Sequence, residues 1–178
     1  MIEQFTITAF SENAIGLLNR ITIIFTRRHI NIESLTVSES SIPGVHKFTI
    51  VVNCSVDLVI KATNQIEKLV EVLKAFYHTK NEIIFQEIAL YKVPTESLLK
   101  SNMIETIVRK NNARIIEITP EYTVIEKTGH EEETTALFEQ LNTYGLKQFT
   151  RSGRIAVTRS NVELLSEFLI SREEVLKN

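Results

Sequence analysis

The chain has 178 residues, enough for one large domain or two small ones. Hydrophobic residues make up 43% of it and charged residues 24%, the balance of an ordinary soluble globular protein. Twenty lysines and arginines against 22 aspartates and glutamates give a net charge of -2, which argues against a nucleic-acid binder. The single cysteine, Cys54, excludes an internal disulfide framework and a cysteine-rich zinc site.

The sequence also argues against membrane insertion. No apolar run is long enough to span a bilayer. The first six residues, Met-Ile-Glu-Gln-Phe-Thr, lack the basic and apolar regions that open a secretory signal. We therefore expect a cytoplasmic chain.

The first half of the chain predicts a βαββαβ order. Residues 2–10 alternate apolar and polar side chains, as a strand does, whereas apolar residues recur at helical spacing from Leu17 to Phe25. In the strand at 30–38 the apolar parity switches near Glu33, which predicts a bulge. A turn at 40–44, a third strand at 47–52, a helix capped by Ser55 and reaching Val70, and a strand at 72–79 follow. This order is typical of a ferredoxin-like sandwich, an antiparallel sheet with helices on one face.

The start of the first helix carries a candidate ligand site. We expect Asn13 to cap this helix, with Gly16 in its first turn, where glycine costs about 0.5–1 kcal/mol relative to alanine. That cost suggests that another group approaches the backbone closely there. The unpaired amides and partial positive charge of a helix N-terminus can hold a small anion such as an amino-acid carboxylate. A capped helix packed on the sheet, with Gly16 there for close packing, accounts for the same residues.

The second half repeats the order more loosely. We expect a strand covered on both faces at 83–93, one helix that begins at Thr95 and carries Leu99 and Met103, and a hairpin over 114–128. A helix beginning at Glu131 and an interrupted strand at 146–157 complete it. The sequence thus predicts an α+β protein with two tandem ferredoxin-like units, at 1–80 and 81–159, and a tail at 160–178 with helical spacing.

No catalytic constellation stands out. The five glycines form neither a phosphate-binding loop nor a dinucleotide fingerprint, and the four histidines form no metal-ligand motif. We interpret Cys54 as a small buried hydrophobic residue and His46 as structural. The sequence therefore predicts no active site and no metal or cofactor bound by this chain.

Two segments resemble the ACT-domain signature of acetolactate synthase small subunits. They are Glu-Asn-Ala-Ile-Gly-Leu-Leu-Asn-Arg at 12–20 and Arg-His-Ile-Asn-Ile-Glu-Ser-Leu at 28–35. The segments at 87–93, 118–124 and 151–153 are similar to later motifs of that family, in the same order. The resemblance covers residues 1–159.

The resemblance implies a regulatory subunit without chemistry of its own. Its large catalytic partner would use thiamine diphosphate, magnesium and FAD to condense pyruvate with pyruvate or 2-oxobutyrate, in branched-chain amino-acid biosynthesis. The small subunit would activate that partner and confer feedback inhibition by valine, bound where the ACT domains of two copies pair as a homodimer. Asn13 and the amides around Ile15, Gly16 and Leu17 would hold the carboxylate of valine. The full set of implied ligand residues is Asn13, Ala14, Ile15, Gly16 and Leu17 of one copy with Asn31 and Ile32 of the other.

Three departures from the family pattern bear on this interpretation. Ile15 stands where the family often has proline or a small residue, which makes the pocket rim bulkier. A difference of one methylene in such a pocket is worth about 1–3 kcal/mol, enough to change the preference among valine, leucine and isoleucine. Arg154 replaces an apolar residue, and the tail at 160–178 extends beyond many relatives.

Two alternatives remain at this point. One is a free-standing ACT-type amino-acid sensor that regulates a different partner, which the match in the second half disfavours. The other is a small enzyme on a ferredoxin-like sandwich, because fold does not fix function. That alternative requires a nucleophile or an acid–base pair in one cleft, and the sequence offers none.

Overall fold

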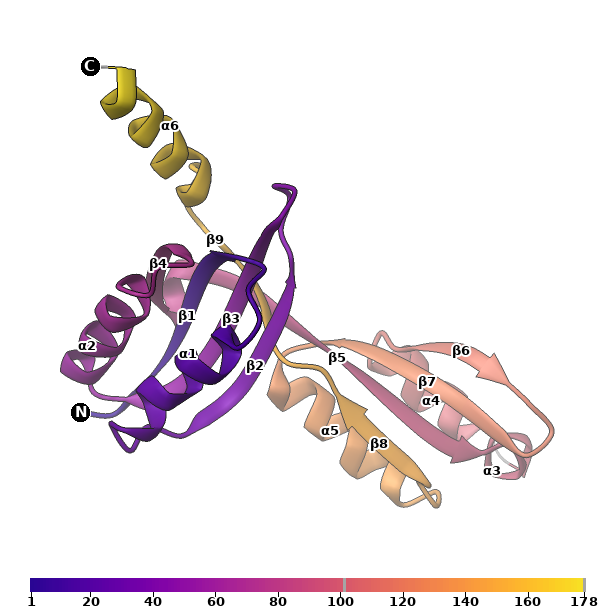
Figure 1. The fold of residues 1–178 in the computed structure, drawn as a ribbon. Helices are drawn as coiled ribbons and strands as arrows, with labels where there is room; N and C mark the ends of the chain where they lie inside the picture. The colour runs from indigo at the N-terminus through magenta and orange to yellow at the C-terminus, as the bar shows by residue number, and fades with distance from the viewer. Residues whose placement is uncertain (101, 178) are drawn as a thin grey trace. The chain divides into compact units, whose positions relative to one another are not determined.

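A computed structural model describes residues 1–100 and 102–177, with side chains as far as residue 170. The chain forms two compact units, one of residues Met1–Ile84 with Arg154–Asn178 and one of residues Phe85–Gly153. Each unit combines an antiparallel sheet with helices (Figure 1). The predicted α+β class with two βαββαβ-like units is confirmed.

The first unit has the predicted element order. Its sheet runs β2-β3-β1-β4, so that β2 lies at one edge. Every neighbouring pair is antiparallel, which makes β1 and β2 parallel to each other on either side of β3. The elements are β1 (Glu3–Glu12), α1 (Leu17–Thr26), β2 (Ile32–Glu39), β3 (Val45–Cys54), α2 (Val56–Glu67) and β4 (Val72–Thr79).

One face of this sheet packs against both helices. Phe5, Ile7 and Ala9 of β1 point into that core, and Thr6, Thr8 and Phe10 alternate with them toward the other face. The predicted helical stripes are only partly buried. Leu18 is 46% exposed, and Val70 is 94% exposed because α2 ends at Glu67, before the last residue of its predicted stripe.

The predicted bulge in the second strand is confirmed. The pairing of β2 with β3 shifts register between Ile32 and Ser34. Because the bulge changes the parity of the strand, both Ile32 and Leu35 contact the core despite their odd spacing.

The second unit has the sheet order β6-β7-β5-β8. Tyr91, Ile125 and Leu137 are fully buried in its core. Its elements are β5 (Ile83–Pro94), α3 (Thr95–Lys100), α4 (Met103–Lys110), β6 (Arg114–Ile118), β7 (Tyr122–Gly129), α5 (Glu131–Asn142) and β8 (Gln148–Arg151).

Two expectations for the second unit are wrong. The strand β5 alternates buried and less buried side chains, with Ile84 and Ile88 about half exposed, and so it is covered on one face. The helix expected from Thr95 is divided into α3 and α4, and Leu99 is 80% exposed. This small unit thus has more apolar residues than it can bury, and some of them remain exposed.

The predicted interrupted strand at 146–157 divides between the units. The short helix η1 (Lys80–Glu82) precedes β5, whose start pairs with β9 (Ile155–Thr158) in the first unit. The compact units therefore differ from the predicted division into 1–80 and 81–159. Arg154 anchors the returning chain, donating from Nη1 to Thr6 Oγ1 at 3.0 Å and from Nη2 to Gln4 Oε1 at 2.8 Å.

The predicted helical tail is present as α6 (Leu164–Lys177). Its first turns belong to the first unit, where Leu165 is 1% exposed and packs in a cluster with Phe10 and Val45. This cluster lies at the end of the sheet where β1 ends and β3 begins, since Glu12 pairs with Val45.

Candidate functional site

The loop Asn13–Gly16 joins β1 to α1 and contains the first predicted ligand residues. The helix begins at Leu17 with Gly16 as its N-cap, so the expectation that Asn13 caps it is wrong. Gly16 has a φ of 82°, a left-handed conformation that glycine adopts without a Cβ penalty. A Cβ built on Gly16 would meet no atom within 4 Å. Backbone conformation, and not close packing within the chain, therefore explains this glycine.

The first turn of α1 presents its free amides three residues later than a cap at Asn13 would place them. The Leu17 amide donates to the Ala14 carbonyl oxygen at 3.3 Å, and the Leu17 side chain is 1% exposed in the core. The helical bonds start with the Arg20 amide, which donates to the Gly16 carbonyl oxygen at 3.2 Å. Helix geometry therefore leaves the amides of Leu18 and Asn19 without a carbonyl in the helix. No acidic residue lies in this turn to oppose an anion.

Apolar side chains and one ion-paired arginine surround this turn. Ile15 is fully exposed and Leu18 nearly half exposed. An ion pair of 2.5 Å between Arg20 and Glu71 fixes the side of the helix, and the hydrogen bond from Arg20 lowers the pKa of Glu71. An exposed isoleucine beside free amides suits a ligand with one apolar and one anionic end.

Asn31 and Ile32 lie at the start of β2. Asn31 is exposed and its Nδ2 donates to Glu33 Oε1 at 3.2 Å, whereas Ile32 is half buried against the core. Both Ile32 and Phe5 pair with Val52 of β3.

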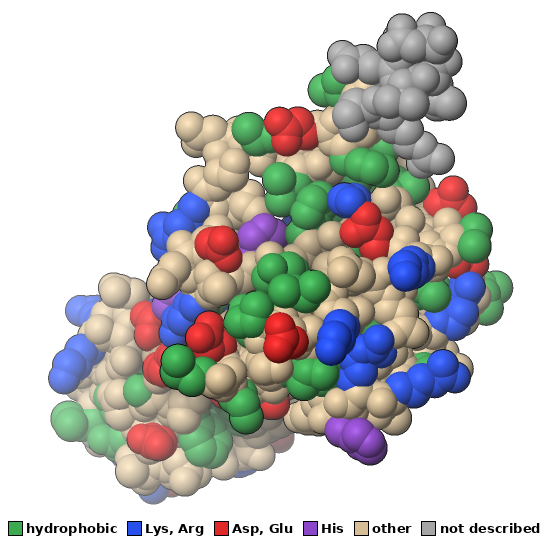
Figure 2. All heavy atoms as spheres, turned by 90° about the vertical axis from the view of Figure 1, so that its left-hand side faces the viewer, with side chains coloured by type: hydrophobic (Ala, Val, Ile, Leu, Met, Phe, Trp, Pro, Cys, Tyr) green, Lys and Arg blue, Asp and Glu red, His purple; other side chains and the backbone are tan. Residues whose placement is uncertain are grey.

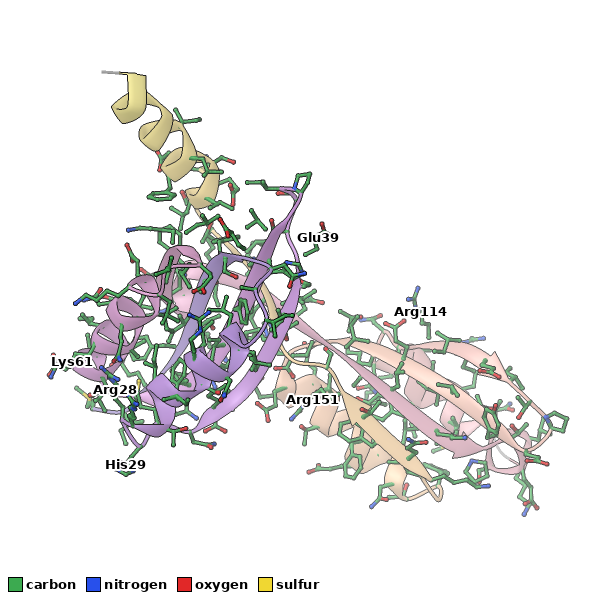
Figure 3. All side chains as sticks on the ribbon, viewed as in Figure 1. Arg28, His29, Glu39, Lys61, Arg114 and Arg151 are labelled. Carbon is green, nitrogen blue, oxygen red and sulfur yellow. The ribbon has the colours of Figure 1, made fainter. Side chains whose placement is uncertain are left out.

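The two groups of ligand residues stand at opposite ends of the sheet. Glu12, which precedes the loop, lies seven residues beyond Phe5 along β1, or about 23 Å at the rise of a strand. In Figure 3 the labelled His29, which precedes β2, and Glu39, which ends β2, lie at opposite ends of that strand. One chain therefore does not bring the predicted site residues together, and they lie in two separate groups, the two half-sites of the predicted ligand site.

Sequence reasoning missed the apolar side chains that this unit leaves exposed on α1 and on its edge strand β2. Val37 of the edge strand β2 is 41% exposed, and Leu18, assigned to the core stripe, faces outward. The sequence did contain a signal for this exposure, because α1 has more apolar residues than one helix face can bury.

The cysteine and the potential metal ligands lie outside the two groups of predicted ligand residues. Cys54 is 4% exposed in the first core, as predicted. Among the described residues, no group of three or more His, Cys, Asp or Glu side chains could hold a metal ion. Acidic and basic side chains both occur on the face in Figure 2. No helix in the described part of the chain is long and apolar enough to cross a membrane.

The first unit belongs to a known class of domain, the ACT domain. Its βαββαβ order, its edge strand β2 and its glycine-capped α1 are those of an ACT domain, and a family model described as "AHAS small subunit-like ACT domain" matches residues 7–74. A second model, "Small subunit of acetolactate synthase", matches residues 86–160.

The relatives identify the family. The acetolactate synthase small subunit of Bacillus subtilis is 35% identical over 161 residues, which are 90% of this chain and 93% of that protein. The probable small subunit of Methanothermobacter thermautotrophicus is 31% identical over 87% of this chain and 92% of its own length. The crystal structure of the small subunit from Thermotoga maritima superposes with a TM-score of 0.81 at 28% identity, covering 90% of this chain and all of that one. The chain belongs to the acetolactate synthase small subunit family and is a regulatory, non-catalytic subunit.

Proposed function

We propose that this chain activates the large catalytic subunit of acetolactate synthase and makes it sensitive to feedback inhibition by valine, in branched-chain amino-acid biosynthesis. Valine binds between the ACT units of two copies of the chain, in the cytoplasm. Thiamine diphosphate, magnesium and FAD belong to the catalytic partner.

The observation that carries the proposal is the separation of the two half-sites along an unpaired edge strand. When two identical β2 strands pair antiparallel, the start of each lies beside the end of the other. The end of β2, at Glu39, is level with Ser11 of β1 through His46, and the loop Asn13–Gly16 leaves the sheet there. Such a pair therefore places Asn31 and Ile32 of one copy beside the loop of the other.

The combined site matches the three parts of a small apolar amino acid. The Asn13 side chain and the free amides at the start of α1 bind the carboxylate. The side-chain oxygen of Asn31 from the second copy accepts a hydrogen bond from the ammonium group. Ile15 and Ile32 contact the side chain of the ligand, and pairing of the two copies covers the exposed Ile15.

Two linked measurements test the function. Calorimetric titration of the chain with valine should show saturable binding at a dimer interface, and alanine, which has two fewer carbons, should bind more weakly. Reconstitution with the large subunit should raise acetolactate formation, and valine should then inhibit it. Activation without valine binding would contradict the proposed ligand, whereas valine binding without activation would indicate an amino-acid sensor with another partner.

A further inference from the structure

A cavity lies on the face of the first unit's sheet that α1 and α2 do not cover. It has a volume of about 100 Å³. Thr8 and Phe10 of β1, with Lys47 and His78, form its sheet side, and the segment from Ala156 to Leu164 closes it. Every residue that lines it belongs to the first unit. Because alternate side chains of a strand face opposite ways, the cavity lies across the sheet from the helices.

The polar groups of the cavity have unused hydrogen-bonding capacity. Lys47 Nζ donates to the Ala156 carbonyl oxygen at 2.7 Å, which leaves two of the three N–H groups of its ammonium for other acceptors. The buried Nδ1 of His78 has no hydrogen-bond partner among the described residues. A buried polar atom without a partner costs free energy, and a bound ligand would recover that cost.

The rest of the lining combines aromatic and aliphatic side chains with Thr8, Thr158 and one carboxylate, that of Glu163. Phe10 lies under the Lys47 ammonium, with the nitrogen 5.9 Å from its ring centroid, and Phe76 lines the same space. Glu163 accepts a hydrogen bond from the Ser166 amide at 2.7 Å, which commits one carboxylate oxygen to the first turn of α6. Lys47 and His78 thus line one small space together with two aromatic rings.

We propose that this cavity binds a short aliphatic monocarboxylate, with its carboxylate on Lys47 and His78 and its alkyl group against Phe10 and Phe76. The site is separate from the valine half-sites, whose residues do not line it. Burial lowers the pKa of His78, and it lowers the pKa of Lys47 against the raising effect of Glu163, so that an added carboxylate would oppose the effect of burial at both groups.

The proposal has a pH signature. The charged groups that act on His78 are Glu82 of η1, which raises its pKa, and Lys47 of β3, which lowers it, while Glu163 lines the opposite wall. A carboxylate placed beside His78 adds a negative charge and raises its pKa, so that binding takes up a proton. Binding therefore tightens as the pH falls through and below 6.5, the ordinary pKa of a histidine, because the pKa of His78 in the free protein lies below that value.

The test is an NMR titration of the full chain with sodium propionate, at ionic strength held constant with sodium chloride. We expect saturable shifts at residues that line the cavity, loss of binding in Lys47→Met, and wild-type binding in Lys61→Met, which removes an exposed lysine from α2. His78→Phe should weaken binding and abolish its pH dependence, and the amide spectra of the variants show whether they fold.

Three results would overturn the proposal. The first is propionate binding that Lys47→Met leaves unchanged. The second is an equal response to chloride alone, which would reduce the cavity to a non-specific anion contact. The third is a set of shifts confined to residues 13–17 and 31–32, which would place propionate in the amino-acid site instead.

Discussion

Substitution of a glycine can act through backbone strain or through steric contacts of the new side chain, and at Gly16 the two effects can be distinguished. Its left-handed backbone strains any side chain, but the space around its Cβ is open. Gly44, in the turn between β2 and β3, has the same properties with a φ of 77°. Strain alone can therefore be measured at Gly44, and any additional effect at Gly16 comes from its place in the proposed site.

We expect Gly16→Asp to raise the valine concentration needed for inhibition at least about 100-fold while activation of the large subunit persists. Two like charges about 4 Å apart repel by several kcal/mol at an effective protein dielectric, so the new carboxylate excludes that of valine. The measurement is valine inhibition of the reconstituted enzyme. Gly16→Asn keeps the shape without the charge and Gly44→Asp keeps the strain, and both should remain inhibited. Wild-type inhibition in Gly16→Asp would place valine elsewhere.

Tyr91 should make the stability of the second unit depend on pH in the alkaline range. Its side chain is fully buried and its hydroxyl donates to the Thr134 carbonyl oxygen at 2.6 Å. Burial raises its pKa to about 12 from an ordinary value of 10.0. The folded state thus holds this proton more tightly than the unfolded state does. The corresponding stability is complete below pH 10 and is lost as the pH rises from 10 toward 12.

In wild type the free energy of unfolding should fall by up to about 2.7 kcal/mol as the pH rises, since two pKa units correspond to this free energy. We expect Tyr91→Phe to lack this decrease. At pH 7 the same variant should be about 1 kcal/mol less stable, because it loses a hydrogen bond. Urea unfolding between pH 7 and pH 12 measures both effects, with Tyr144→Phe as the control for loss of a half-buried hydroxyl. Parallel pH profiles for wild type and Tyr91→Phe would contradict the assignment.

At the scale of elements, local patterns predicted the order of strands and helices but not where each one packs. Period-2 and period-3.6 spacing is a local signal, so β1, the bulge in β2 and β4 were predicted well. The start of α1 was misplaced because capping preference depends on the side chain of Asn13, whereas the φ of Gly16 decides where the helix begins. No local signal assigns β9 to the first unit, because the partners of Arg154 lie near residue 5.

Arg154 therefore offers a test of how β9 is held. Its guanidinium bonds to Thr6 and Gln4, its backbone amide donates to Ser34 Oγ at 3.0 Å, and its side chain is almost fully buried. We expect Arg154→Met to destabilise the first unit by about 2–3 kcal/mol, because hydrogen bonds to a charged group are lost and Thr6 remains buried without that donor. Chemical denaturation measures the change, and Arg27→Met, at an exposed position, is the control. An unchanged midpoint in Arg154→Met would show that other contacts hold β9.

At the scale of the whole molecule, the sequence could identify the residues of the candidate site but not the fact that one chain separates them. Asn13 and Asn31 stand in recognisable segments, yet their positions at opposite ends of the sheet follow from β1 and β2 being parallel on either side of β3. A ligand that contacts both groups requires two chains. The valine site that we propose therefore forms between two copies of the chain.

Mixing two inactive variants tests that claim most directly. Asn13→Ala and Asn31→Ala should each lose valine binding when present alone. In a mixed dimer, one site carries both substitutions, and the other combines the intact Asn13 of one chain with the intact Asn31 of the other. Calorimetric titration of the mixed dimer, prepared with two affinity tags, should recover one valine site per dimer with wild-type affinity. No recovery in a dimer verified to contain both variants would contradict a site shared between chains.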